Sequence, residues 1–243
     1  MVDYWSFLLL LPVIAFLYGA VGHGGASGYL ALMALYSFSP EVMRPTALLL
    51  NLFVAGISFF HYWRAGYFNR KLFLAFAGGS IPFSFLGGML DVDTRVYKMT
   101  LGALLIFAIL RMLNVFGKSR ENIVPIKWSI GIITGAVIGF FSGLFGIGGG
   151  IILSPVILLL HWGKVKEAAA VSALFIWVNS ASGLAGQFST GIKLDVNSWI
   201  FVALALIGGY YGGYFGSKKL NNRNLRYLLA FVLVLAAVKL LLA

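Results

Sequence analysis

The sequence predicts an all-α polytopic membrane protein built from two inverted-topology repeats, and three observations favour this fold class. Of the 243 residues, 60% are apolar and only 10% are charged, with a mean hydropathy of +0.95. A soluble domain would carry about a quarter charged residues. Apolar segments occur twice in the order long, short, short, short. Each long segment is also interrupted by a run of glycines at the same relative place.

The apolar segments divide the chain into two similar halves. We expect a first transmembrane repeat over 1–115, a polar connector over 116–127 and a second repeat over 128–243. Glu41 and Glu167 both precede the second segment of their repeat, and His61 and Gln187 both lie near its end. The expected segments are 4–36, 46–63, 72–90 and 97–115, followed by 128–160, 168–188, 198–217 and 225–242.

The two long segments, 4–36 and 128–160, exceed what one membrane crossing needs. A straight helix of this length would measure about 50 Å, against a hydrocarbon core of about 30 Å. The glycine runs Gly22–Gly25 and Gly146–Gly150 allow the backbone to bend inside each segment. Irregular backbone at membrane depth is tolerated where it is buried in protein or lines a cavity. We therefore expect each long segment to break at its glycines, as the discontinuous helices of transporters do.

The distribution of Lys and Arg favours a hairpin-like long segment. If every segment crosses once, the basic residues divide evenly between the two sides. If each long segment folds back at its glycines, the first and second repeats insert in opposite senses. One side then keeps Arg44, Arg95, Lys98, Lys193 and Lys239, and the other thirteen of the chain's 18 basic residues face the opposite side. This bias matches the positive-inside rule and predicts both termini outside the cytoplasm.

Composition also excludes several function classes. The net charge of +11 comes mainly from short loops, which favours topology control over nucleic-acid binding. The chain has no cysteine, so thiolate metal sites and disulfides are excluded, and we predict no metal and no cofactor. All acidic residues fall at segment ends or in loops, whereas cation carriers usually place carboxylates inside the bundle.

An anion site is the function that the broken segments favour. Helix N-termini and glycine-rich turns bind negative charge through backbone N–H groups. We predict substrate binding by the two glycine runs with added side-chain donors: Gly22, His23, Gly24, Gly25, Ser27, Asn51, Gly146, Gly148, Gly149, Gly150 and Asn179. The alternative is that these glycines only allow close helix packing, which we prefer for the pairs at 78–79, 87–88, 208–209 and 212–213.

Three polar residues are candidates for gating or proton coupling: His23, His61 and Gln187. A structural role is open for His23, as a cap of a broken helix, and for His61, at the interface. One enzyme-like signal is also present. Gly25-Ala-Ser27-Gly28 is the short string that rhomboid-type intramembrane serine proteases carry, with His61 as a conceivable partner. The second repeat has no serine at the matching place, and such strings have low specificity. We predict no enzymatic activity.

The segment Gly143-Leu-Phe-Gly146-Ile-Gly-Gly-Gly150-Ile-Ile-Leu-Ser154-Pro155 resembles the glycine-rich signature of the sulfite exporter TauE/SafE family. The first glycine run and His61-Tyr-Trp-Arg64-Ala-Gly66 are similar to the other repeat of that family. The resemblance covers essentially the whole chain. It implies a multi-pass permease of the bacterial or archaeal inner membrane, acting on sulfite, sulfonates or related small sulfur-containing anions.

The combined prediction is a multi-pass exporter of small sulfur-containing oxyanions in the inner (cytoplasmic) membrane. The expected partners are a small anionic substrate and the lipid bilayer, and both a monomer and a homo-oligomer remain open. The alternatives are an anion channel, a carrier of carboxylates, and the intramembrane protease that would use Ser27.

Overall fold

The computed structural model describes residues 4–93 and 123–218, together with isolated positions between 95 and 110 and at 234 and 238. These parts are helices joined by short loops, and they contain no strand. The helices are α1 (Tyr4–Ala20), α2 (Ala26–Leu35), α3 (Pro40–Arg64), α4 (Arg70–Met89), α6 (Trp128–Phe145), α7 (Gly150–Leu159), α8 (Val165–Ser189) and α9 (Ser198–Lys218).

Five of these helices are long and apolar enough to cross a membrane, namely α3, α4, α6, α8 and α9. The predicted segments 46–63, 72–90, 168–188 and 198–217 correspond to four of them. The predicted segments 97–115 and 225–242, and most of the connector 116–127, lie outside the continuously described residues. The prediction of an all-helical membrane protein is therefore confirmed for the described part of the chain.

Both long apolar segments break at their glycines. The first is divided into α1 and α2, and the second into α6 and α7. Gly25 and Gly149 directly precede the second helix of each pair, with φ angles of +104° and +77°. Such angles belong to the left-handed region that side chains disfavour, which explains glycine at these positions. Because α2 and α7 each have 10 residues, about 15 Å, neither is long enough to cross a bilayer alone.

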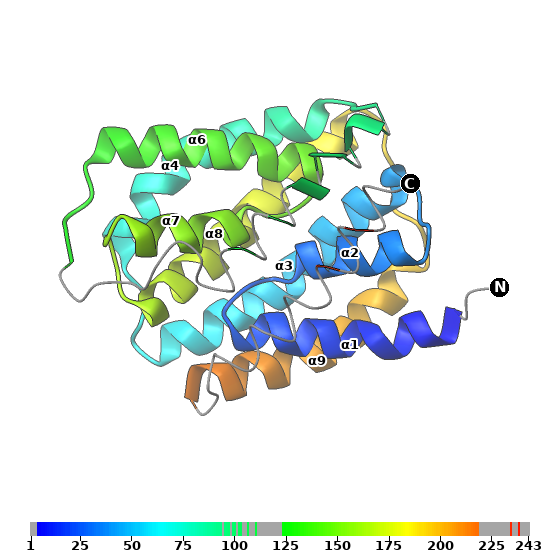
Figure 1. Ribbon diagram of the computed structural model, residues 1–243, viewed down its shortest axis with the longest axis horizontal. Coiled ribbons are helices and arrows are strands. Elements are labelled where there is room, and N and C mark those ends of the chain that lie inside the picture. Colours follow the sequence, from blue (N-terminus) through cyan, green and yellow to red (C-terminus); the bar gives the residue numbers. More distant parts are fainter. Residues whose placement is uncertain are drawn as a thin grey trace.

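Each broken segment folds back on itself. In the first, the Ser6 hydroxyl bonds the Tyr36 hydroxyl, so the two ends of the segment lie side by side. In the second, the amide of Val124, just before α6, donates to the carbonyl of His161, just after α7, at 2.7 Å. Figure 1 shows α2 running back beside α1 toward the end where α1 begins. The hairpin that the charge distribution favoured is thus present in both segments.

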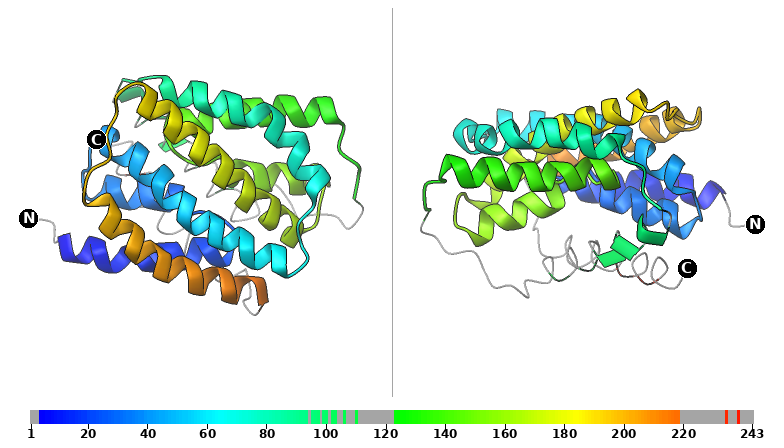
Figure 2. Two further views of the ribbon diagram at one scale, coloured as in Figure 1. Left: turned by 180° about the vertical axis from the view of Figure 1, so that it is seen from behind. Right: turned by 90° about the horizontal axis from the view of Figure 1, so that it is seen from above.

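The helices pack in matched pairs. The helices α3 and α8 cross the middle of the molecule, with α1 and α9 on one flank and α4 and α6 on the other (Figures 1 and 2). The counterparts of α1, α2, α3 and α4 are α6, α7, α8 and α9. When each helix is exchanged for its counterpart, the contact of α1 with α9 becomes that of α6 with α4, and the contact of α3 with α9 becomes that of α8 with α4. The pairs α2·α3 and α7·α8 exchange in the same way. The duplicated order of segments is therefore accompanied by a duplicated set of contacts.

The flanking pairs are held together by glycines. A Cβ at Gly79 or Gly87 of α4 would lie 2.1 Å from a carbonyl oxygen of α6, and one at Gly208 of α9 would lie 2.0 Å from the Pro12 carbonyl of α1. Small residues allow two backbones to approach in this way. Of the glycine pairs for which we preferred a packing role, only Gly78 has no atom near its Cβ position.

We expect Gly79→Ala to destabilise the protein markedly and Gly78→Ala to leave it unchanged or slightly more stable. The first methyl would overlap the Ile132 carbonyl, whereas the second would enter open space. Alanine favours a helix over glycine by about 1 kcal/mol, so helix propensity alone predicts a gain for both variants. Thermal unfolding of the two purified variants in one detergent measures the difference. Equal melting temperatures would contradict the packing role.

Candidate functional site

The side chain of Asn51 caps the beginning of α2. Its Oδ1 accepts a hydrogen bond from the backbone amide of Ala26, the first residue of α2, at 3.0 Å. The residue before it, Gly25, has no side chain that could do this. The first amides of a helix have no partner within the helix, so they need a cap from elsewhere. Asn51 supplies that cap from α3, although it lies 25 residues further along the chain.

The same amide group also contacts the second glycine turn. The Nδ2 of Asn51 donates to Ser180 Oγ of α8 at 3.2 Å. A Cβ at Gly148 would lie 2.4 Å from this Nδ2, and a Cβ at Gly24 would lie 2.5 Å from Oδ1. Both would also lie 2.9 Å from the Cγ2 of Ile176. The two glycine turns, one from each half of the chain, therefore meet on opposite atoms of Asn51.

This meeting point lies near the middle of the two central helices. Asn51 is near the middle of α3, which runs over Pro40–Arg64, and Ser180 is near the middle of α8, which runs over Val165–Ser189. The N-termini of α2 and α7 thus converge between the halfway points of the two central helices. Each N-terminus carries the positive end of a helix dipole, equivalent to about half an elementary charge. The arrangement concentrates positive potential around Asn51 without placing an ionised side chain there.

The remaining predicted glycines surround this point. Gly22 lies against Ala169 of α8, and Gly146 lies against the backbone of Arg44 of α3. Both are left-handed, with φ of +75° and +73°. Each turn thus contacts the first turns of the central helix that belongs to the other repeat. Gly149 contacts Phe175, and Gly150 contacts Ile176. All of these glycines are buried.

Ser27 joins the two arms of the first hairpin. Its Oγ donates to the hydroxyl of Tyr18 in α1 at 2.9 Å, and both groups are buried. His61, the residue that the protease alternative requires as a partner, instead has its ring against Tyr210 and Tyr214 of α9. The hydrogen bond to Tyr18 therefore gives Ser27 a structural role within the hairpin.

Asn179 lies at the contact between α8 and α4. Its Nδ2 donates to Ser80 Oγ at 3.1 Å and to the Phe175 carbonyl at 2.8 Å, while its backbone carbonyl accepts from the Ser84 hydroxyl. Its Oδ1 is buried and has no hydrogen-bond partner. Asn51 and Asn179 are thus both buried, but only Asn51 bonds to the residues around the glycine turns.

Of the three candidates for gating, His61 and Gln187 lie near the C-terminal ends of α3 and α8, and His23 lies in the first glycine turn. The ring Nδ1 of His23 bonds to the Val21 carbonyl at 3.0 Å, and the residue is half-buried. His61 has a buried Nε2 without a hydrogen-bond partner. Gln187 is fully buried, and neither atom of its amide has a partner. Buried polar atoms are nearly always paired, so His61 Nε2 and the Gln187 amide are groups that an ordered water or a bound solute would satisfy.

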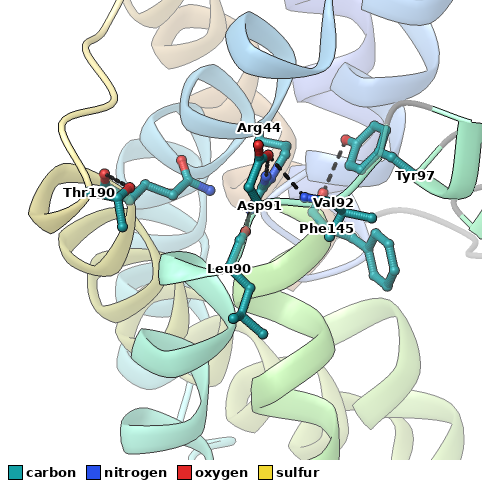
Figure 3. A network of polar contacts seen from close by, with 8 residues as sticks. Arg44, Leu90, Asp91, Val92, Tyr97, Phe145 and Thr190 are labelled. Carbon is teal, nitrogen blue, oxygen red and sulfur yellow. Dashed lines mark hydrogen bonds and ion pairs between the residues drawn. The ribbon is translucent and has the colours of Figure 1, made fainter.

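One residue that the sequence reasoning counted only as a loop charge is buried. Arg44 lies in the second turn of α3 and is 3% exposed. Its Nη2 donates to the Leu90 carbonyl at 3.0 Å, and its Nη1 lies 3.8 Å from the Asp91 carboxylate. Figure 3 shows this guanidinium beside Leu90 and Asp91. Proximity to the end of an apolar segment hid its burial, and no local pattern in the sequence indicates it.

These features define a class, the polytopic helical membrane transporters. The chain belongs to the sulfite exporter TauE/SafE family, whose model matches residues 7–240. It is 38% identical to probable membrane transporter protein y4hK of Sinorhizobium fredii over 94% of both chains. It is 28% identical to probable membrane transporter protein YunE of Bacillus subtilis over 97% of both chains. It is also 28% identical to probable membrane transporter protein MJ0441 of Methanocaldococcus jannaschii over 94% of both. No solved structure matches the chain.

Proposed function

We propose that this membrane transporter exports small sulfur-containing oxyanions, such as sulfite or organosulfonates, across the inner membrane. The observation that carries the proposal is the convergence of the α2 and α7 N-termini on Asn51. The backbone amides of Gly24, Gly25, Gly148 and Gly149 would donate to the anion. Of the predicted side-chain donors, Asn51 lies at the meeting point and His23 lies in the first glycine turn. Ser27 and Asn179 would donate to the anion only after leaving their bonds to Tyr18 and Ser80. Pyramidal and tetrahedral anions present several acceptor oxygens, which suits a ring of donors.

The absence of carboxylates from this region supports an anion over a cation. Among the described residues, no Asp or Glu side chain is buried, and the groups that bond to Asn51 are the Ala26 amide and the Ser180 hydroxyl. A fixed lysine or arginine at this point would hold an anion tightly and slow its release. Helix N-termini supply a weaker attraction, which a transporter needs for both binding and release.

Binding between the turns requires the two repeats to move apart. Even a methyl group at Gly24 or Gly148 would overlap Asn51 and Ile176, so an anion of several heavy atoms has no room there when the turns are in contact. We propose that this movement opens the site in turn to each side of the membrane. Inverted repeats provide such a motion, because one repeat can rock against the other around a fixed site.

The proposed orientation places the two repeats in opposite senses, with both termini outside the cytoplasm. The folding back of both long segments and the bias of Lys and Arg support it. A membrane potential that is negative inside contributes about 2.3 kcal/mol per charge per 100 mV toward anion export. Export therefore needs no coupling ion, although His23 could shuttle a proton if coupling occurs.

The test is flux in proteoliposomes that contain the purified protein. Labelled sulfite, sulfoacetate, taurine and acetate are compared at one concentration and one imposed potential. We expect saturable transport of sulfite and sulfoacetate that is faster than transport of acetate. Acetate moving as fast as the sulfur anions would show a general carboxylate or anion carrier. Flux that rises linearly with concentration would show a channel.

Ser27→Ala separates transport from the protease alternative. We expect transport to decrease only partly, because the substitution removes one buried hydrogen bond, worth about 1 kcal/mol, to Tyr18. A serine protease would lose all activity with its nucleophile. Sulfite flux and cleavage of a labelled transmembrane peptide are measured on the same preparation. Peptide cleavage by the unmodified protein that disappears in Ser27→Ala would contradict the proposal.

A further inference from the structure

A buried positive charge lies on the same face of α3 as Asn51. Arg44 precedes Asn51 by seven residues, and both side chains are buried. Seven residues correspond to two helical turns, so the two positions share a face and lie about 10 Å apart along the axis. Ser58, seven residues beyond Asn51, is also buried, and its hydroxyl has no hydrogen-bond partner. A polar stripe therefore extends along the interior face of α3 in both directions from the meeting point of the glycine turns.

The charge of Arg44 is only weakly compensated. The guanidinium donates to one neutral carbonyl, that of Leu90, and its Nε is buried without a partner. The nearest carboxylate, that of Asp91, lies 3.8 Å from Nη1, but its side chain is 97% exposed. A cation near a helix N-terminus is also disfavoured by the helix dipole. Burying a charge costs free energy unless it is paired, so this position favours an additional negative partner.

The surroundings of Arg44 suit a small anion. Its backbone contacts Gly146, at the beginning of the second glycine turn. Gln187 of α8, with both amide atoms unpaired, lies toward the same end, because α8 runs antiparallel to α3. Figure 3 shows Thr190, which donates to the Gln187 carbonyl, in the same region as Arg44. Two unsatisfied donor groups and a glycine turn from different helices thus occupy one end of the bundle.

We propose that Arg44 contacts the transported anion between Asn51 and the nearer membrane surface, and that Asp91 competes with the anion for its guanidinium. This inference rests on the proposed function and adds a charged residue to the path. The Leu90 carbonyl and the Asp91 carboxylate hold the guanidinium when no anion is bound. A bound anion replaces the contact with Asp91, which is the longer of the two. The anion can then pass without leaving the charge of Arg44 unpaired.

The test measures KM and Vmax for sulfite in proteoliposomes. We expect Arg44→Gln to raise KM by about tenfold or more, since a buried charged partner is lost, and Arg44→Lys to restore part of this. Asp91→Asn should lower KM by about two- to threefold, because an exposed competitor is removed. Arg64→Gln removes a positive charge at the exposed far end of α3 and is the control for Arg44→Gln. Asp93→Asn removes a negative charge two residues from Asp91 and is the control for Asp91→Asn. Neither control should alter KM.

The outcomes separate this inference from the proposed function. Unchanged KM in both Arg44→Gln and Asp91→Asn would overturn the role of Arg44 while leaving transport intact. If Arg44→Gln does not fold, Asp91→Asn decides, and a KM equal to that of Asp93→Asn overturns the proposal. If the unmodified protein carries no anion, the proposed function fails. The contact of an anion with Arg44 is then tested by binding alone. Sulfite should raise the melting temperature of the unmodified protein more than that of Arg44→Lys, and an equal shift would overturn the inference too.

Discussion

Asn51→Asp should nearly abolish anion transport while leaving the protein folded. An aspartate has the shape of asparagine and still accepts the hydrogen bond from the Ala26 amide. It adds a negative charge at the point where the α2 and α7 N-termini converge, so it occupies the positive potential that the anion would use. Two like charges about 4 Å apart repel by about 4 kcal/mol at an effective dielectric constant of 20. We therefore expect the transport rate at low sulfite concentration to decrease by at least about 100-fold.

The measurement is the initial rate of sulfite flux, normalised to the amount of monodisperse protein in the liposomes. Asn197→Asp is the matched control, because it introduces the same chemical change at an exposed position before α9. It should transport sulfite at the rate of the unmodified protein. Normal transport by Asn51→Asp would show that the anion does not use the meeting point of the glycine turns.

Gly148→Ala should both destabilise the protein and stop transport. Gly148 has a φ of +69°, and its new methyl would lie 2.4 Å from Asn51 Nδ2. The left-handed conformation alone costs a non-glycine residue about 1–2 kcal/mol. Relief of the overlap would displace Asn51 or Ile176, which contact both glycine turns, and would disturb the cap of α2. We therefore expect Gly148→Ala to lower the free energy of unfolding by well more than this conformational cost.

Gly66→Ala isolates that conformational cost. Gly66 has a similar φ of +79°, but no atom lies within 4 Å of its Cβ position. The melting temperature of the Gly66→Ala protein should fall modestly, and this protein should still transport sulfite. The difference between the two variants measures the effect of close contact at the meeting point. If Gly148→Ala is no worse than Gly66→Ala, the turns are not held together as the structure shows.

The broken segments were predictable because their causes are local. A 33-residue apolar segment is too long for one crossing, and glycine runs mark the positions where it bends. Duplication placed these features twice in the chain, and both hairpins form where the glycines predict. The packing role of Gly79, Gly87 and Gly208 could be predicted as well, since small residues at matched places in apolar helices indicate close helix contacts.

The partners of the polar residues were not predictable to the same extent. Asn51 and Asn179 occupy similar places in their segments, and the sequence indicated only that both face the interior. Their bonds differ because each residue of a helix is rotated by about 100° from the one before it. This direction decides which neighbouring helix the side chain meets. Arg44 was missed for a related reason. Its position near a segment end matches an exposed loop charge, and only the packing of α3 against the second glycine turn buries it.

By itself, the amino-acid sequence determined the membrane environment, the all-helical class, the repeated order of apolar segments and the positions of both breaks. These properties depend on hydropathy, residue spacing and backbone freedom, which act within a few turns of chain. Only the tertiary structure decided that the two breaks meet on one amide at Asn51 and that Arg44 is buried. Contacts between residues more than 100 positions apart depend on how whole helices pack, and no local pattern specifies that packing.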